Sequence, residues 1–348
     1  MKTLLEIKTV DREFYAQRLR DWLPDGIIDI HTHVWLKRFN EKKKELLKRT
    51  ASWPSMVADE NTVEDLIETY RLLFPGKTVI PLMFTNVVPE GNLDQANDYV
   101  SGVSRKHDFP ALIFSHPHWD AAELEKRIQE GNFLGAKSYL SLAPSRLLPS
   151  EIRIFDFFPH HHLAVLNKHG LLMMLHIPRN DRLRDPVNLA QMLEIEERYP
   201  DIKLIIAHVG RAYCPEDIGD AFTVLAKTRT MCFDISANTN AETFRRLLET
   251  VGPKRVLFGS DLPVLRMRTR RICERGRYIN LVPQGMYGDV SADNHMREVE
   301  GGAAEELTFF MYEELDAFRR AARAVKLRAG DIEDVFHNNA RRLLNMRD

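Results

Sequence analysis

The chain has 348 residues, and 44% of them are hydrophobic, so it carries enough apolar side chains for a substantial core and is not a disordered protein. Its 49 Lys and Arg against 50 Asp and Glu give a formal net charge of -1, which excludes a general attraction to nucleic acid or to an anionic membrane. Charges interrupt the N-terminal stretch, and no run of ~18 apolar residues occurs. We therefore expect a soluble, cytoplasmic protein with no membrane partner.

The cysteine content also favours a cytoplasmic protein. Three cysteines, Cys214, Cys232 and Cys273, are too few for a disulfide framework and lack the paired spacing of metal ligands. We expect thiols without a chemical role in a reducing compartment.

Eight short apolar segments rich in β-branched residues recur along the chain, each followed by a stretch with helical character. They lie at Ile27–His33, Thr78–Phe84, Ala111–His116, Leu134–Leu140, Leu171–His176, Ile202–His208, Thr230–Ser236 and Arg255–Ser260. A spacing of roughly 30 residues per unit is typical of βα repeats that build a parallel sheet. Eight such units predict a (β/α)8 TIM barrel in one domain over residues 1–348. A doubly wound open sheet is the competing architecture, but the Gly-rich phosphate turn expected after its first strand is absent.

Helices and insertions complete the predicted barrel. Apolar residues at three- and four-residue spacing predict outer helices within 62–74, 120–131, 188–200 and 241–252. Two stretches, Trp35–Asp59 and Arg266–Gly302, exceed the repeat after strands one and eight, where barrel enzymes place active-site loops. We expect lids there, although a solvated excursion or a subunit contact remains open. Two further helices are expected at Ala303–Val325 and Asp331–Met346.

Histidines and an aspartate end several of the predicted strands. Because side chains alternate along a strand, Asp29, His31 and His33 point the same way in the first one. His176, His208 and Asp261 end strands five, six and eight, and all strand ends of a closed barrel surround one mouth. Imidazole nitrogen and carboxylate oxygen suit Zn2+ or a related divalent ion, and a catalytic site keeps one position open for water whose pKa the metal lowers. Asp261 is placed to accept the water's proton.

The motifs DIHTH, MLHIP, AHVGR, LFGSDLP and VFHNNARRLLNM together resemble the amidohydrolase-related family of the amidohydrolase superfamily. The resemblance implies a distorted (β/α)8 barrel with one divalent metal, and by motif the ligands are His31, His33, His176 and Asp261. It gives the strand-six histidine, His208, the role of polarising the substrate or orienting the nucleophile. Members of this family include hydrolases, decarboxylases and metal-free lactonases, so family alone does not fix the reaction.

Other polar residues near the strand ends could be either metal ligands or ordinary structural or substrate-binding residues. The resemblance raises the question of whether Lys137 on strand four is a carbamylated bridging ligand, but an ordinary lysine that binds a substrate anion is favoured. His116 and His118 follow strand three, and His160 to His162 begin a predicted helix. For both groups, hydrogen-bonded or exposed imidazoles are favoured over metal ligands.

Five substrate contacts are predicted from the sequence. Trp35, Arg179, Arg211 and Tyr213 lie just past the ligand strands, and Lys137 lies on strand four. Because a guanidinium matches a carboxylate, the substrate is expected to carry one. Six arginines between Arg266 and Arg277 provide a cationic rim, or alternatively a solvated helix or an oligomer contact.

The sequence thus favours a metal-dependent hydrolase of a small molecule, with Asp261 and His208 as catalytic residues and one Zn2+ or Mn2+ per chain. Non-oxidative decarboxylation is the first alternative, and a catalytically inactive binding barrel is the second. Self-association is left open.

Overall fold

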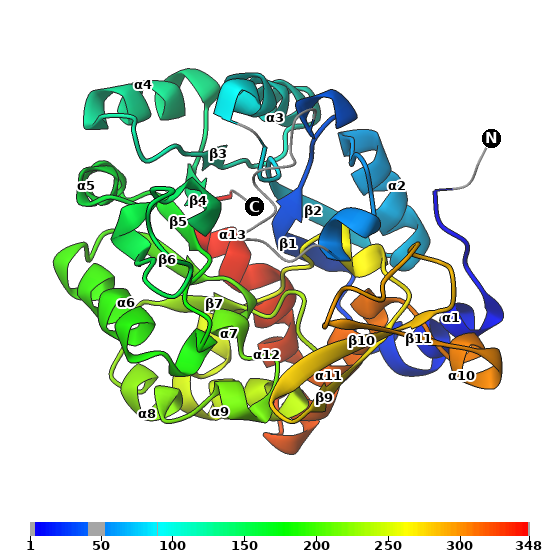
Figure 1. Cartoon of the computed structure of the whole chain (residues 1–348). Helices are drawn as coiled ribbons and strands as arrows, with labels where there is room; N and C mark the ends of the chain where they lie inside the picture. Colours follow the sequence, from blue (N-terminus) through cyan, green and yellow to red (C-terminus); the bar gives the residue numbers. More distant parts are fainter. Residues whose placement is uncertain (1–3, 41–52, 89, 347–348) are drawn as a thin grey trace.

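A computed structural model describes residues 4–40, 53–88 and 90–346 (Figure 1). All eight predicted β segments form strands, most of them shorter than expected. The strands are β1 (Gly26–His33), β2 (Thr78–Phe84), β3 (Ile113–Phe114), β4 (Gly135–Ser138), β5 (Leu172–Leu175), β6 (Lys203–Ile206), β7 (Cys232–Asp234) and β8 (Val256–Leu257).

These strands are parallel throughout. Strands β3 to β8 form a six-stranded sheet in chain order, and β1 pairs with β2. Two single-residue parallel bridges connect the sheets, one between Met83 and Ala111 and the other between Thr32 and Leu262. The chain therefore has an α/β fold with parallel sheets, and both edges of the β1–β2 pair contact the larger sheet.

The strands are apolar on both faces, which is typical of parallel sheets covered by helices. One cluster of buried side chains includes Ile28, Leu172 and Met174 of the strands together with Ala340 and Leu344 near the C-terminus. The chain neighbours of these strand residues, Ile27 and Met173, belong to the larger cluster, which also contains buried residues of the helices. Figure 1 shows helices α3 to α6, α8 and α9 outside the strands.

The helices predicted at 62–74, 120–131, 188–200 and 241–252 are all present. The helices are α1 (Thr9–Phe14), α2 (Val63–Leu73), α3 (Leu93–His107), α4 (Ala121–Gly131), α5 (His160–Lys168), α6 (Pro186–Arg198), α7 (His208–Arg211), α8 (Ala221–Leu225), α9 (Ala241–Val251), α10 (Gly301–Glu305), α11 (Phe310–Ala324), α12 (Ala329–Glu333) and α13 (Asn339–Leu343). The predicted helix at Ala303–Val325 is split between α10 and α11, where Phe309 bridges to Arg268.

The second insertion folds as a small sheet. Strands β9 (Arg270–Glu274) and β10 (Arg277–Pro283) form an antiparallel hairpin, and β11 (Met296–Val299) adds to β10 in parallel. Four of the six arginines, Arg270, Arg271, Arg275 and Arg277, therefore lie on this hairpin, and the alternative of a solvated helix is wrong. Much of the first insertion, residues 41–52, lies outside the described residues.

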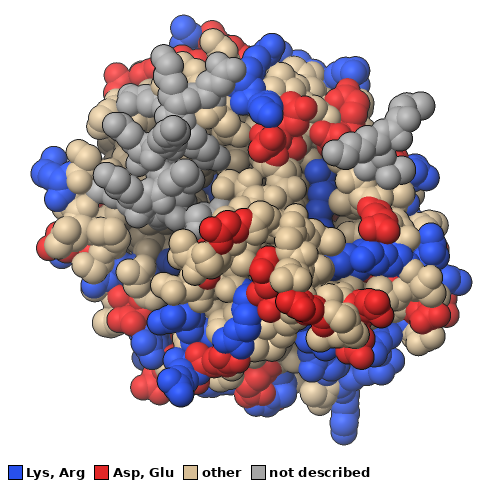
Figure 2. Space-filling model, turned by 45° about the vertical axis from the view of Figure 1, so that its right-hand side comes forward, with Lys and Arg blue, Asp and Glu red and all other residues tan. Residues whose placement is uncertain are grey.

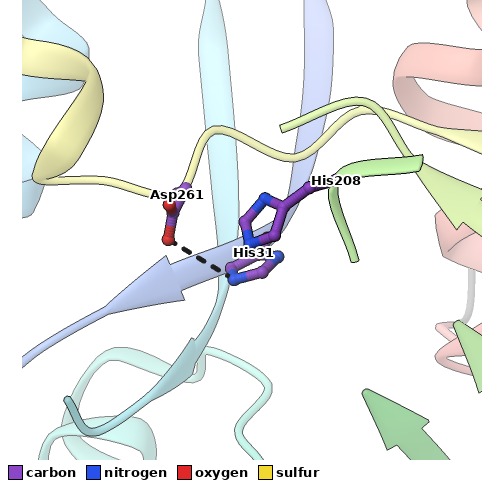
Figure 3. Close-up of side chains that lie close together, drawn as sticks. All are labelled: His31, His208 and Asp261. Atoms are coloured by element: carbon purple, nitrogen blue, oxygen red, sulfur yellow. Dashed lines mark ion pairs between the residues drawn. The ribbon is translucent and has the colours of Figure 1, made fainter. Parts of the chain in front are cut away.

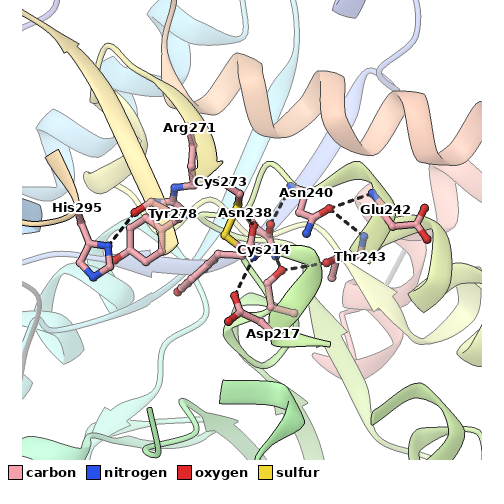
Figure 4. The surroundings of a disulfide bond; sticks show 12 residues. Cys214, Asp217, Asn238, Asn240, Glu242, Thr243, Arg271, Cys273, Tyr278 and His295 are labelled. Carbon is pink, nitrogen blue, oxygen red and sulfur yellow. Dashed lines mark hydrogen bonds between the residues drawn. A yellow bond between two sulfur atoms is a disulfide. The ribbon is translucent and has the colours of Figure 1, made fainter. Parts of the chain in front are cut away.

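The expectation of uninvolved thiols is wrong for two of the three cysteines. Cys214, after β6, and Cys273, on β9, form a disulfide with a Cα–Cα distance of 5.8 Å (Figure 4). The two residues are 59 positions apart and meet because the hairpin folds back over the loop after β6. Cys232 is free and buried.

The surface carries no single dominant charge on the face seen in Figure 2, where Lys and Arg alternate with Asp and Glu. This mixture matches the formal net charge of -1. Among the described residues, no helix is long and apolar enough to cross a bilayer.

Candidate metal centre

Asp261 faces both histidines of β1. Its Oδ1 lies 3.2 Å from His33 Nε2 and 3.5 Å from His31 Nε2. Gly259, two residues earlier, allows this approach, because a Cβ there would lie 2.8 Å from the Cβ of His31. Figure 3 shows the His31 and His208 rings and the Asp261 carboxylate turned toward one another. Ligand atoms of these three residues all lie within 4.8 Å of one another.

Three of the imidazoles are anchored in the same way. The Nδ1 of His31 donates to Asp234 Oδ2 at 2.8 Å, and that of His33 donates to the Thr85 carbonyl at 3.1 Å. His208 Nδ1 lies 3.1 Å from the Ser236 carbonyl. A proton on Nδ1 leaves Nε2 with its lone pair free, which is the form that binds a metal. The donor set therefore fits a divalent cation.

His208 stands on a turn of unusual backbone. Residues His208, Val209, Gly210 and Arg211 have φ values of 57°, 47°, 60° and 62°, so all four are left-handed. Such conformations cost about 1–2 kcal/mol for each residue with a side chain and cluster at functional sites. The turn directs His208 and Arg211 toward the same cavity, since both line it.

His176 lies next to this group and differs from the other three histidines. Its ring centroid is 5.4 Å from that of His208 and 4.7 Å from that of Tyr139. Its buried Nδ1 has no hydrogen-bond partner among the described residues. The structure therefore brings His31, His33, His208 and Asp261 together and places His176 at the side of His208.

Lys137 of β4 also points into the centre. Its Nζ lies 2.8 Å from His31 Nε2 and 4.0 Å from the centroid of the Phe84 ring. Burial lowers the pKa of Lys137 to about 7, although Asp261 and Asp234 favour its charged form. A neutral amine is compatible with a neighbouring metal, whereas an ammonium would repel it.

Burial and mutual contacts set the protonation of the site. Burial and Lys137 lower the pKa of His31 and of His33, so both rings are neutral near pH 7. Burial alone would raise the pKa of Asp261, but the contact with His33 and the other nearby imidazoles hold it below the usual range. The site thus presents neutral imidazoles and an ionised carboxylate, which are the protonation states that a metal requires.

The centre opens into a cavity of about 1330 Å³. Four of the five predicted substrate contacts line it, namely Trp35, Lys137, Arg211 and Tyr213. The fifth, Arg179, is not among the lining residues, and its Nε contacts both oxygens of Asp185 at 2.9 and 3.0 Å. Asp185 is held there because it caps helix α6. Arg179 is therefore not placed among the substrate contacts.

The histidines that the sequence analysis set aside form hydrogen bonds in the loop after β3 and at the start of α5. His161 and His162 each place Nε2 within 2.9 Å of the Trp119 carbonyl. The backbone N–H of His118 donates to His116 Nδ1, and His160 contacts Tyr199. Among the described residues, none of these imidazoles belongs to the group that converges on Asp261.

Two residues that orient the centre were missed by sequence reasoning. Asp234 ends β7 and accepts a hydrogen bond from His31 Nδ1. Ser236 lies 2.8 Å from His208 Nδ1 and donates a hydrogen bond to Asp234. The signal was present, because Asp234 ends an apolar strand just as the candidate ligands do. These residues link the two imidazoles through one hydrogen-bonded network.

The family model for amidohydrolases, Amidohydro_2, matches residues 28–346. The chain belongs to this amidohydrolase family. The match extends from β1 through Asp261 to α13 and so includes every candidate ligand. No curated protein matches the chain.

Solved structures share the fold at low sequence identity. Amidohydrolase 2 from Bifidobacterium longum subsp. infantis is 18% identical with a TM-score of 0.54, over 93% of this chain and 100% of that one. A dihydroxybenzoic acid decarboxylase from Polaromonas sp. JS666, with bound manganese and 2-nitroresorcinol, is 14% identical with a TM-score of 0.55, over 93% and 98%. A probable 2-pyrone-4,6-dicarboxylic acid hydrolase from Acinetobacter baumannii, with bound citric acid, is 16% identical with a TM-score of 0.54, over 92% and 99%. The family is thus enzymatic and includes both hydrolases and decarboxylases.

Proposed function

We propose that this protein is a metal-dependent hydrolase of a small, carboxylate-bearing molecule. The observation that carries the proposal is the convergence of His31, His33 and Asp261, with His208 beside them, at the wall of a cavity. The anchored Nδ1 atoms direct ligand-competent nitrogens into the same space.

The proposed metal ligands are His31, His33, His176 and Asp261, and one ion is expected per chain. Zn2+ is the preferred metal for three imidazoles and a carboxylate, with Mn2+ as the alternative, as in the manganese-containing decarboxylase. When bound, the metal supplies Lewis acidity, which lowers the pKa of water and polarises a substrate oxygen. Lys137 is proposed to remain an unmodified amine.

The protein's own residues are assigned separate tasks. Asp261 takes a proton from the nucleophilic water and passes it to the leaving group, since its low pKa keeps it ionised beforehand. His208 Nε2 accepts a hydrogen bond from the nucleophilic water and orients it. Its Nδ1 proton faces the Ser236 carbonyl, because the Ser236 hydroxyl proton is donated to Asp234, and Nε2 therefore keeps its lone pair.

Arg211 is the proposed anchor for the substrate carboxylate. One of its nitrogens, Nη1, is fixed by the carbonyls of residues 177 to 179 at 3.1–3.2 Å, which leaves the rest of the guanidinium to the cavity. Among the described residues, no carboxylate forms an ion pair with Arg211. Tyr213, Trp35 and Lys137 are proposed to contact the remainder of the substrate.

The proposed architecture is a single (β/α)8 barrel over residues 1–348 in the cytoplasm. Backbone bonds from Ile30 to Phe258 and from His33 to Leu262 support closure between β1 and the end of β8. Residues of both insertions, including Trp53 and Tyr278, line the cavity together with Asp261 and His208, which supports the assignment of lids. Self-association remains open, and the disulfide makes the cytoplasmic assignment worth testing separately.

Decarboxylation is the alternative reaction, because Arg211 places a cation and Lys137 an amine donor along a cavity suited to a substrate carboxylate. The two reactions are distinguished by incubating metal-loaded protein in H2-18O with a panel of aromatic and unsaturated carboxylates, lactones and amides. Hydrolysis predicts that the organic product contains 18O. Decarboxylation predicts that CO2 is released and that the organic product contains no 18O. If neither reaction occurs with any compound although metal is bound, the second alternative, a catalytically inactive binding barrel, is favoured.

A further inference from the structure

Two arginine side chains lie against the same two tyrosine rings in the cavity wall. The Arg271 Cζ is 4.9 Å from the centroid of the Tyr213 ring and 4.4 Å from that of Tyr278. The Arg182 Cζ is 5.3 Å and 5.1 Å from the same two centroids. All four residues line the cavity. Two positive charges are thus concentrated around one pair of aromatic rings.

The negative charge at this place balances only one of the two arginines. Arg182 Nη1 contacts Asp217 Oδ2 at 2.7 Å. Arg271 donates to Asn280 Oδ1 at 2.9 Å and to the Ala237 carbonyl at 2.6 Å, and neither partner is charged. Among the described residues, no carboxylate forms an ion pair with Arg271, and its buried Nη2 has no partner.

Glu314 of α11, which is fully buried, is a carboxyl group that acts electrostatically on Arg271. Burial raises the pKa of Glu314 well above its usual range, with further contributions from Asp29 and Asp234, and so favours its neutral form. Arg271 therefore remains a cation that is 8% exposed and lacks a compensating charge. An uncompensated buried charge is costly, and a bound anion removes that cost.

The geometry connects this arginine pair to the proposed metal centre. The ring centroid of Tyr213 lies 6.5 Å from that of His208, and Tyr213 and Tyr278 are in contact at 5.0 Å. Figure 4 shows Arg271 and Tyr278 beside the disulfide, which ties β9 to the residue after Tyr213. A flat molecule of one or two rings is long enough to reach from His208 along Tyr213 to the guanidinium groups.

We propose that Arg182 and Arg271, with Tyr213 and Tyr278, form a second anion subsite in the wall of the same cavity. The substrate is then a flat, unsaturated molecule with two anionic groups, one near Arg211 and the metal centre and the other at Arg271. This inference rests on the proposed function for the first group only. The second group is a carboxylate or a phosphate-like group, and both are recognised by guanidinium.

A purely structural role for Arg271 makes a different prediction. If the guanidinium only packs among aromatic rings, the protein has no preference for a second anionic group on a ligand. If it is a subsite, a ligand with a second anionic group gains affinity through Arg271, and the gain persists without metal.

The test measures binding of benzoate, benzene-1,3-dicarboxylate and 3-phosphonobenzoate to metal-free protein by titration calorimetry. At least one of the two doubly anionic probes is expected to bind tenfold or more tightly than benzoate, and the one that gains more identifies the second group. In Arg271→Met the gain is expected to fall below twofold, and in Arg271→Lys it is partly retained. Arg297→Met is the matched control, since Arg297 is an exposed arginine of the same small sheet that pairs with Glu274.

Equal affinity of the wild-type protein for all three probes would overturn the proposal without any variant. An undiminished gain in folded Arg271→Met would do so as well, and Arg182→Met provides a second variant if that protein does not fold. Because no metal is present, these outcomes are independent of whether the proposed hydrolysis occurs. A failed activity assay with intact selectivity between the probes would contradict the proposed function alone.

Discussion

Asp234 Oδ2 accepts a hydrogen bond of 2.8 Å from His31 Nδ1, and both side chains are completely buried. Burial opposes ionisation of this aspartate, but the contact with His31 lowers the pKa of Asp234 to about 2, so it remains charged. The pair fixes the His31 ring and leaves Nε2 facing Asp261.

Asp234→Asn tests this support directly. The amide keeps the volume but loses the charge that holds the Nδ1 proton, so affinity for Zn2+ is expected to fall 10–100-fold while the fold is retained. Competition against a metal-binding dye measures the affinity. An affinity within twofold of the wild type would mean that Asp234 does not orient a ligand.

His176→Ala and His208→Ala separate a ligand from a substrate contact. His176→Ala is expected to weaken metal binding at least tenfold, because it removes one of four ligands. His208→Ala is expected to retain the metal and to lower kcat by about 10²–10³, because it removes the group that orients the nucleophilic water. If His208→Ala loses the metal and His176→Ala keeps it, the two roles are reversed.

Arg211→Met is expected to raise KM by one to two decades with little change in kcat. The proposed contact with the substrate carboxylate is the same in the ground and transition states and is worth roughly 1.5–3 kcal/mol. Arg179→Met is the matched control, since Arg179 pairs with Asp185 and does not line the cavity. Steady-state kinetics on the substrate give both parameters. Unchanged KM in Arg211→Met would exclude Arg211 as the carboxylate anchor.

Asp29 is expected to make stability depend on pH. Burial raises its pKa from 3.8 to about 7, although Ser260, Tyr70 and His31 donate hydrogen bonds to it. Because the folded state holds this proton more tightly than the unfolded state, the associated stability is present below pH 4 and is lost as pH rises toward 7. Asp29→Asn should flatten the free energy of unfolding over that range, as measured by urea titration at several pH values. A pH dependence identical to that of the wild type would contradict the shift.

Thiol counting tests the disulfide. Denatured, unreduced protein is expected to react with one equivalent of a thiol reagent, at Cys232, and reduced protein with three. Three reactive thiols before reduction in protein isolated without reductant would show that Cys214 and Cys273 are not bonded.

The sequence predicted what depends on local pattern. Alternation along β1 correctly placed His31 and His33 on one side, and apolar runs located all eight strands. The arginines depended on tertiary neighbours that no local pattern contains. Arg179 follows His176 by three residues just as Arg211 follows His208, yet Arg179 forms an ion pair with Asp185 at the start of α6. Arg271 reaches the cavity only because the β9–β10 hairpin folds back over the loop after β6, which also brings Cys273 to Cys214.

Metal content of the purified protein is the most direct test of the central claim, that His31 and His33 hold a divalent ion. Elemental analysis after dialysis against metal-free buffer is expected to find about one Zn2+ or Mn2+ per chain in the wild type and none in the folded His31→Ala/His33→Ala variant. Two ions per chain would require a bridging ligand and so contradict the unmodified Lys137. Equal metal content in the wild type and the double variant would contradict the metal centre itself.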